Sequence, residues 1–335
     1  MKLLRKILIP VVPMYYLITW LRNIFYDIGI KTSTSFSIPV ICVGNLSVGG
    51  TGKTPMIEYL IRLLKDDHKT ATLSRGYKRK TKGFLLANES TTSEDIGDEP
   101  YQFYNKFGKQ VMVAVDGNRI NGISQLLQHT KPPEVVLLDD AFQHRKVKAG
   151  FNIMLTTYQK PYFKDIVLPT GDLREPRSGA KRADIIVVTK CPLDLREEDK
   201  SFFLKQINAN KEQYVFFSSI SYSDEIFSNK AKMHLMDLRD FVLVTGIANA
   251  TPMVNFLKSK NLNFEHLNFK DHYEFSNKDI SNLESKTTIL TTEKDFMRLK
   301  HYKSLEDKLY YLPIRVKIDK NKMFDNLIKT FIDKY

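Results

Sequence analysis

The chain has 335 residues, and its 51 Lys and Arg against 38 Asp and Glu give a formal net charge of +13. With 42% hydrophobic and 27% charged residues, the composition is typical of a folded globular protein and excludes a disordered or collagen-like chain. The length favours one large domain plus a smaller one. The excess of positive charge indicates a polyanionic partner, which composition alone leaves open among nucleic acid, an anionic membrane surface and a phosphorylated substrate. The two cysteines, Cys42 and Cys191, are too few for a disulfide framework and form no zinc motif, so we expect a reduced protein.

Residues 1–35 differ in composition from the rest of the chain. Basic residues precede an apolar stretch from Ile7 to Leu21, which contains the only tryptophan, Trp20. This stretch is shorter than the roughly 20 residues that span a bilayer, and Pro10 and Pro13 interrupt it. A signal peptide is the rival interpretation, but no small-residue cleavage site follows. We expect an N-terminal membrane-associated helix that lies in the interface, with packing on the protein's own core as the alternative.

A glycine-rich loop follows the first predicted strand, residues 40–43. The loop ends in Gly52-Lys53-Thr54 and leads into an amphipathic stretch, which is the context of a Walker A phosphate-binding loop. Ser47 stands at the first glycine position of the strict motif, so Gly49 and Gly50 would supply the flexibility. In such a loop the lysine contacts the β- and γ-phosphates and the threonine hydroxyl binds magnesium. The predicted nucleotide-binding residues are Ser47, Val48, Gly49, Gly50, Thr51, Gly52, Lys53 and Thr54.

A second predicted strand, residues 135–138, ends in Asp139-Asp140. A hydrophobic strand that ends in a carboxylate resembles a Walker B motif and predicts Asp139 as a magnesium ligand. The strand at residues 185–188 runs into Thr189-Lys190, but the next acid, Asp194, is two residues too far for a guanine-specificity motif. ATP is therefore the predicted nucleotide.

Two further loops are rich in functional residue types. Residues 95–100 carry acids that suit a general base or a magnesium ligand, and residues 168–177 carry Arg174 and Arg177, which suit a phosphorylated substrate. Composition alone leaves open the alternative that both are ordinary solvated loops.

These motifs together resemble the tetraacyldisaccharide 4′-kinase family of lipid A biosynthesis. The residues that carry the resemblance, in chain order, are Ser47–Pro55, Ser74–Tyr77, Gly97–Pro100, Leu138–His144, Leu173–Pro176 and Thr291–Asp295. The resemblance implies transfer of the γ-phosphoryl group of ATP to the 4′-hydroxyl of a membrane-embedded tetraacylated glucosamine disaccharide 1-phosphate, giving lipid IVA. It also implies a protein that works at the cytoplasmic face of the bacterial inner membrane, peripheral or monotopic.

The resemblance assigns roles to the remaining site residues. Asp98 is expected to be the base, working with His272, although Tyr273 replaces the second histidine of the family's motif. Lys53 is expected to act on the phosphates, and Mg²⁺ to be held by Thr54, Asp139 and Glu99. The substrate residues expected near the sugar and its 1-phosphate are Asn45, Arg119, Arg174 and Glu175. Asp140 is expected behind the metal ligands, and His144 in a structural role.

Predicted strands near residues 40–43, 111–115, 135–138, 152–155 and 185–188 alternate with helical stretches. This pattern predicts an α/β fold of the P-loop type, with a mostly parallel, doubly wound sheet. A later strand at 241–244 and a helix at 251–258 predict a second, smaller α/β lobe. We therefore divide the chain into the membrane-interacting helix, 1–35, the kinase core, 36–219, and the smaller lobe, 220–335. Asp98 and His272 would then come from different lobes.

The competing function class is a membrane-associated P-loop ATPase that acts as a switch or partner-binding module. Such a protein would hydrolyse ATP slowly without a lipid acceptor. Nucleic acid is the least expected partner, because no RNA-recognition signature is present. The expected partners are the lipid acceptor and an anionic membrane surface.

Overall fold

The computed structural model describes residues 5, 7–271 and 273–335. The chain forms two compact units: unit 1 comprises the described residues up to Ile220 together with Val316–Tyr335, and unit 2 is Ser221–Arg315. The chain passes from unit 1 to unit 2 within strand β8 and returns within strand β15.

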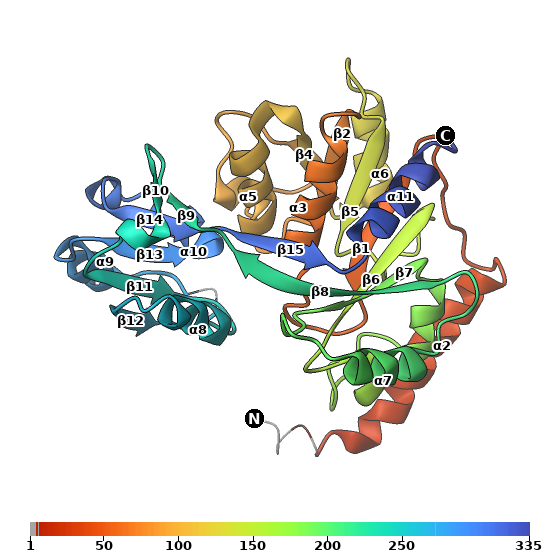
Figure 1. Ribbon diagram of the computed structural model, residues 1–335. Coiled ribbons are helices and arrows are strands. Elements are labelled where there is room, and N and C mark those ends of the chain that lie inside the picture. Colours follow the sequence, from red (N-terminus) through yellow and green to blue (C-terminus); the bar gives the residue numbers. More distant parts are fainter. Residues whose placement is uncertain (1–4, 6, 272) are drawn as a thin grey trace. The chain divides into compact units, whose positions relative to one another are not determined.

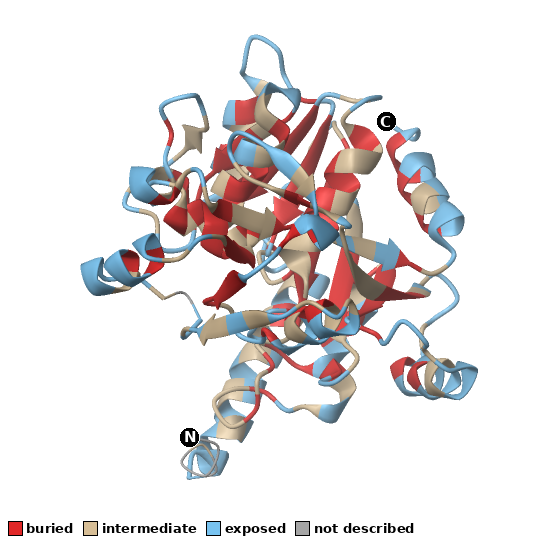
Figure 2. Ribbon diagram, turned by 60° about the vertical axis from the view of Figure 1, so that its left-hand side comes forward, coloured by how far each residue is buried: buried red, intermediate tan, exposed pale blue. Residues whose placement is uncertain are grey.

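Unit 1 is built on a nine-stranded sheet with the order β15-β8-β7-β6-β1-β5-β2-β4-β3. Its strands are β1 Val40–Asn45, β2 Thr70–Ser74, β3 Leu85–Leu86, β4 Met112–Val115, β5 Val135–Asp139, β6 Phe151–Thr157, β7 Ile185–Thr189, β8 Tyr214–Tyr222 and β15 Ile314–Ile318. Every pair from β8 through β4 is parallel, whereas β3 is antiparallel to β4. The parallel strands read as continuous apolar runs because helices cover both faces of the sheet, and the strands between the helices are the most buried part of the molecule (Figure 2).

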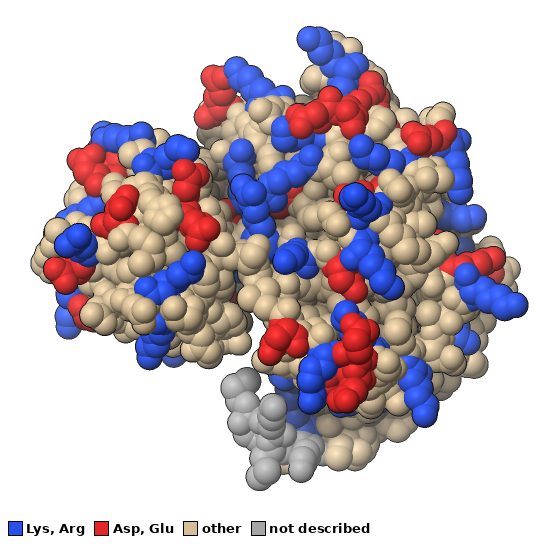
Figure 3. Space-filling model, viewed as in Figure 1, with Lys and Arg blue, Asp and Glu red and all other residues tan. Residues whose placement is uncertain are grey.

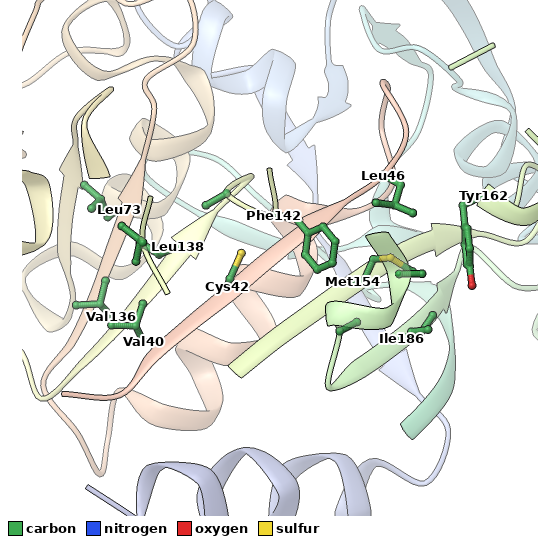
Figure 4. Packing of buried hydrophobic residues seen from close by; sticks show 14 of the residues in the cluster. Val40, Cys42, Leu46, Leu73, Val136, Leu138, Phe142, Met154, Tyr162 and Ile186 are labelled. Carbon is green, nitrogen blue, oxygen red and sulfur yellow. The ribbon is translucent and has the colours of Figure 1, made fainter. Parts of the chain in front are cut away.

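The helices of unit 1 are α2 Val12–Asp27, α3 Lys53–Leu64, α4 Ser93–Ile96, α5 Asp98–Phe107, α6 Arg119–Leu127, α7 Glu197–Ile207 and α11 Asn321–Ile332. Helices α6 and α7 lie on one face of the sheet, and α3, α5 and α11 lie on the other (Figure 1). Successive residues of a strand point to opposite faces, so Val40 and Cys42 of β1 enter one hydrophobic core while Ile41 and Val43 enter the other. Helices α6 and α7 complete the first core, part of which is drawn in Figure 4, and α3, α5 and α11 complete the second.

Unit 2 has its own six-stranded sheet with the order β10-β9-β14-β13-β11-β12. Its elements are β9 Glu225–Phe227, β10 Lys232–His234, β11 Phe241–Thr245, α8 Thr251–Ser259, β12 Phe264–Asn268, α9 Asn277–Glu284, β13 Ile289–Thr292, α10 Glu293–Leu299 and β14 Leu309–Leu312. Strands β11 to β14 are parallel, and β9 is antiparallel to its neighbours β14 and β10.

The predicted α/β fold with a mostly parallel sheet is confirmed. The smaller lobe predicted from the sequence, residues 220–335, is too long at its end, because Val316–Tyr335 belongs to unit 1. The reason is the apolar stripe of α11: Phe324 and Ile328 are fully buried in the same core as Ile41 of β1.

Helix α2 begins where the prolines of the apolar stretch lie. Pro10 is in the preceding 3₁₀ turn, Ile9–Val11, and Pro13 is in the first turn of α2, where the missing N–H is no loss. The prolines therefore start the helix instead of interrupting it. In the described part of the chain, no helix is both long enough and apolar enough to cross a bilayer.

Lysine and arginine side chains are spread over both units on the face drawn in Figure 3, with aspartate and glutamate among them. The net charge therefore does not by itself locate a functional site. The site must be found from the contacts of individual residues.

Candidate active site

The phosphate loop joins the end of β1 to the start of α3. Gly49 and Gly52 have φ angles of 109° and 90°, which side-chain-bearing residues rarely adopt, and Gly52 is the residue that precedes the helix. The first N–H groups of a helix have no partner within it, so the start of α3 at Lys53 is suited to bind phosphate oxygens.

The side of the phosphate loop nearest β7 is held by the two residues around the end of that strand. Thr189 donates its hydroxyl to the carbonyl of Thr51 at 2.7 Å, and Lys190 donates to the carbonyl of Gly50 at 2.6 Å. Burial and the nearby charge of Lys53 lower the pKa of Lys190. Lys190 is thus a second cation at the loop.

The other side of the phosphate loop is held by the loop of residues 168–177. Ser47 pairs with Leu173 in a short β-bridge, and Val48 N–H donates to the carbonyl of Asp172 at 2.7 Å. Asn45 is fully buried and donates its side-chain amide to the hydroxyl of Thr51 at 2.8 Å. These contacts join the phosphate loop to the loop of residues 168–177.

Asp139 lies at the end of β5, beside β1, where parallel strands present their carboxyl ends. Its Oδ1 is buried and has no hydrogen-bond partner among the described residues, while Oδ2 accepts from the hydroxyl of Ser74 at 3.3 Å. Burial and the charge of Glu99 raise the pKa of Asp139 to about 7, although Lys53 opposes the shift. A buried, incompletely bonded carboxylate beside a second acid is an environment that a bound cation would stabilise.

The hydroxyl of Thr54, one residue into α3, lies 3.4 Å from Oε1 of Glu99. Thr54, Asp139 and Glu99 are oxygen donors of the kind that magnesium prefers. Within the described residues, however, no three His, Cys, Asp or Glu side chains gather closely enough to hold a metal by themselves. The donor set therefore fits Mg²⁺ that takes part of its coordination from phosphate oxygens and water, as is usual for this ion.

Asp140 joins two of the cations at the phosphate loop, Lys53 and Arg174. Its Oδ1 lies 3.6 Å from Nζ of Lys53 and 2.8 Å from a terminal nitrogen of Arg174, and its Oδ2 accepts from the other terminal nitrogen at 3.2 Å. Burial acts to raise the pKa of Asp140, but Lys53 and Arg174 outweigh it and hold the pKa below its ordinary value. Arg174 also donates to the side-chain oxygen of Asn45.

The comparison with known families agrees with this arrangement. The model of the LpxK family, tetraacyldisaccharide-1-P 4′-kinase, matches residues 4–333. The chain belongs to this family. The resemblance, and the kinase activity that it implies, are thereby confirmed.

Relatives of the chain in this 4′-kinase family match over nearly their whole lengths. The tetraacyldisaccharide 4′-kinase of Flavobacterium johnsoniae is 52% identical, over 99% of this chain and 98% of the relative. That of Bacteroides thetaiotaomicron is 44% identical, over 95% and 90%. A crystal structure of LpxK from Aquifex aeolicus in complex with ATP has a TM-score of 0.80 at 32% identity and covers 98% of this chain and 99% of that one.

Two residues expected at the substrate have buried side chains in this LpxK-family chain. Arg119, at the start of α6, is almost fully buried and donates to the backbone carbonyls of Asp116 and Asp139 at 2.5 and 3.4 Å. Burial lowers the pKa of Arg119, while Asp139 acts to raise it. Arg119 thus contacts the backbone at the end of β5, through the carbonyl of Asp139.

Glu175 is also buried, in a network of four contacts. Its carboxylate accepts from Asn23 at 2.6 Å, from Gln143 at 2.9 Å and from Arg182 at 2.8 and 3.0 Å. The network ties α2 to the loop of residues 168–177, and both oxygens of Glu175 are occupied.

Asp98 is the first residue of α5 and follows Gly97, whose φ is 90°. His272 lies outside the described residues, so its pairing with Asp98 stays a prediction.

Lys190 is a site residue that the sequence does not reveal, because its only local pattern is an incomplete guanine motif. The available signal was the end of β7 at the same edge of the sheet as the phosphate loop. Two further residues enter the site only in the structure: Gln143 donates both to Glu175 and to the backbone carbonyl of Asn45 at 2.8 Å, and Asn23 on α2 donates to Glu175. Gln143 lies within the motif Leu138–His144, whereas no local pattern marks Asn23.

Proposed function

We propose that this chain transfers the γ-phosphoryl group of ATP to the 4′-hydroxyl of a tetraacylated glucosamine disaccharide 1-phosphate, giving lipid IVA. The observation that carries the proposal is the position of Asp139 on the strand next to the phosphate loop, with a buried Oδ1 that has no hydrogen-bond partner among the described residues, in a chain of the 4′-kinase family. ATP would supply the phosphates that the phosphate loop binds.

The nucleotide phosphates would lie on residues 47–54, against the first N–H groups of α3 and the ammonium group of Lys53. Lys190 and Thr189 keep the loop in place by their bonds to Gly50 and Thr51. Asp140 and Arg174 position Lys53 from the other side. A preorganised set of positive groups of this kind stabilises the charge that spreads over the transferred phosphoryl group.

Thr54, Asp139 and Glu99 would hold Mg²⁺ together with phosphate oxygens. When bound, the ion supplies charge neutralisation on the β- and γ-phosphates. Occupancy of this position would also compensate the buried charge of Asp139, whose pKa burial raises in its absence.

Asp98 would take the proton of the acceptor hydroxyl, with His272 as its partner. The acceptor oxygen forms a bond to the γ-phosphorus while the bond from that phosphorus to the β–γ bridging oxygen breaks. ADP leaves, and the proton of the hydroxyl moves to the carboxylate of Asp98. The position of Asp98 at the start of α5, one residue before the proposed magnesium ligand Glu99, supports this assignment.

Helix α2 would place the chain on an anionic membrane surface at the cytoplasmic face of the inner membrane. The helix attaches to the rest of unit 1 through polar groups: the hydroxyl of Tyr15 donates to Arg174, Arg22 donates to Gln143, and Asn23 donates to Glu175. Its large apolar side chains are instead exposed, which reverses the usual order for a helix on a protein surface.

The exposed apolar residues of α2 and the turn before it are Ile7, Leu8, Ile9, Val11, Met14, Tyr16, Leu17, Ile18, Trp20, Leu21 and Phe25. A continuous apolar surface of this kind is typical of a membrane or partner contact. Because the opposite side of α2 touches the loop with Arg174, a chain seated on the membrane would bring its site close to a lipid acceptor.

The test uses the full chain in neutral detergent with γ-labelled ATP, Mg²⁺ and the tetraacyldisaccharide 1-phosphate. We expect label in the lipid product, no transfer when Mg²⁺ is omitted, and no transfer by a Lys53→Met variant. An unlabelled lipid product would overturn the proposal. ATP hydrolysis at the same rate with and without the lipid would instead favour the switch ATPase.

A further inference from the structure

A cavity of about 520 Å³ lies in unit 1 at the carboxyl ends of β2 and β4. Its lining includes Arg75, Lys78, Arg79 and Lys82 from the turn after β2, and Asp116 from the end of β4. No motif of the phosphate loop contributes to it. Four cationic side chains against one carboxylate make the cavity strongly positive, and its volume is large enough for a phosphate group together with part of a sugar.

The carboxylate of Asp116 is already occupied. Its Oδ1 accepts from the N–H of Asn118 at 2.8 Å, and its Oδ2 accepts from the side chain of Asn121 at 2.6 Å. In contrast, Arg75, Lys78 and Lys82 have neither a hydrogen bond nor an ion pair to any residue that the structure describes; the ammonium group of Lys78 lies 5.9 Å from the ring centroid of Tyr77. Their charges are therefore available to an anionic ligand.

The backbone around the cavity is held in place by its own contacts. Arg79 donates to the carbonyl of Gly83 at 2.5 Å and to that of Val115 at 3.5 Å, so this side chain braces the turn. The hydroxyl of Thr81 donates to the carbonyl of Asp95 at 2.5 Å, and the N–H of Lys80 donates to that of Glu94 at 2.8 Å. A cationic turn with a fixed backbone loses less conformational entropy on binding than a flexible one.

The cavity is next to the proposed base. A Cβ atom on Gly97 would lie 2.9 Å from the carbonyl oxygen of Tyr77, and one on Gly76 would lie 3.1 Å from the carbonyl oxygen of Ile96. The turn therefore touches the backbone immediately before Asp98. On its other side, Ser74 precedes Arg75 and donates to Asp139.

The 1-phosphate of the acceptor needs cationic partners of its own, besides those that bind the phosphates of ATP. Its 1-phosphate was expected near Arg174 and Glu175, but the guanidinium of Arg174 is paired with Asp140, and both oxygens of Glu175 accept from other side chains. A phosphate monoester needs cations that are not already neutralised.

We propose that the cavity formed by the turn after β2 binds the 1-phosphate of the lipid acceptor. This assignment rests on the proposed function. Arg75 offers a planar fork for two phosphate oxygens, while Lys78 and Lys82 act as point charges at the rim. The cavity then fixes the far end of the disaccharide while the 4′-hydroxyl faces Asp98.

The test compares the acceptor with an otherwise identical acceptor that lacks the 1-phosphate, both in neutral detergent with γ-labelled ATP. The variant is the double substitution Lys78→Gln and Lys82→Gln, which breaks no hydrogen bond or ion pair to the described residues. The matched control is Lys205→Gln with Lys211→Gln, which removes two exposed lysines of unit 1 away from the cavity. Circular dichroism and the Tm verify that all proteins are folded.

For the wild type and the control we expect kcat/KM to be about tenfold higher for the phosphorylated acceptor, a preference that corresponds to about 1.4 kcal/mol. In the double variant this preference disappears through a higher KM for the phosphorylated acceptor, and the KM for ATP stays within about twofold. An unchanged preference, or a rise in the KM for ATP instead, would overturn the assignment.

If the wild type labels neither acceptor, the proposed function fails. Calorimetric titration with glucosamine 1-phosphate, compared with glucosamine, then tests the cavity by itself. Loss of glucosamine 1-phosphate binding in the double variant supports a phosphate site, and unchanged binding overturns it.

Discussion

Arg174 holds Asp140 with both of its terminal nitrogens, at 2.8 Å from Oδ1 and 3.2 Å from Oδ2. Because Asp140 also lies 3.6 Å from Nζ of Lys53, this one carboxylate connects the loop of residues 168–177 to the lysine of the phosphate loop. We therefore propose that Arg174 is a positioning residue, which acts on Lys53 through Asp140.

The substitution Arg174→Lys should lower kcat by about 10- to 100-fold, since a lysine keeps the charge but cannot make the two-point contact with Asp140. Label transfer from ATP to the lipid acceptor measures the effect. The control is Arg196→Lys, an arginine whose exposed ion pair with Asp199 spans 3.2 Å and which should leave kcat unchanged. Wild-type kcat in Arg174→Lys would show that the two-point geometry is dispensable.

The parts of this molecule that were predicted correctly are those whose causes are local. The β1 strand, the glycine loop and α3 follow one another directly in the chain, and an apolar strand that ends in Asp139 has one physical arrangement in a parallel sheet. The parts that were missed depend on contacts between distant positions. The partners of Glu175 are at positions 23, 143 and 182, and no spacing rule connects them.

The C-terminal boundary was misplaced for the same reason. The amphipathic pattern of α11 shows that it buries one face, but not which core receives it. The chain re-enters unit 1 where β15 pairs with β8. These strands lie about a hundred positions apart in the sequence, so no local pattern predicts their pairing.

The substitution Arg182→Met should destabilise the protein by about 3 kcal/mol, because it leaves the buried carboxylate of Glu175 without its cation. Urea denaturation measures the free energy of unfolding. The matched control is Lys80→Met, which breaks an exposed pair with Glu94 and should not change stability measurably. Equal stabilities of the two variants would mean that the Glu175 network does not hold α2 to the loop.

The stability of the protein should fall as the pH drops from about 6.5 to about 4, in part because of His144. Burial, together with the charge of Arg119, lowers the pKa of His144 to about 4, whereas an unfolded histidine titrates near 6.5. In this window the unfolded chain binds the extra proton, so acid favours unfolding. We expect His144→Gln to flatten the dependence of the Tm on pH between about 4 and 6.5, and His129→Gln, an exposed histidine, to leave it unaltered. Parallel curves for wild type and His144→Gln would exclude this histidine as the source.

The triple substitution of Leu17, Ile18 and Leu21 by Gln should weaken binding to vesicles of phosphatidylglycerol and phosphatidylethanolamine at least about tenfold, since burying an apolar side chain contributes about 1.5–3 kcal/mol. Substitution is preferable to deletion of the helix, because Tyr15, Arg22 and Asn23 also hold the active-site loops. Cosedimentation measures the bound fraction. The control replaces two exposed methionines elsewhere, Met236 and Met323, by Gln. Undiminished binding of the triple variant would leave the apolar face of α2 without its proposed membrane role.

The substitution Asp98→Asn should lower kcat by about 10²- to 10⁴-fold while the affinity for ATP stays within about twofold, because a general base contributes to the transfer step and not to holding the nucleotide. Asparagine keeps the size and the first-turn position of the residue at the start of α5 but cannot accept the proton. Rapid-quench label transfer measures kcat, and equilibrium binding of a fluorescent ATP analogue measures affinity in the same preparation. Glu94→Gln, an exposed acid on the neighbouring helix α4, controls for the loss of one negative charge. Turnover within about threefold of wild type would remove Asp98 from the role of base, and a parallel loss of ATP affinity would assign it to the nucleotide site instead.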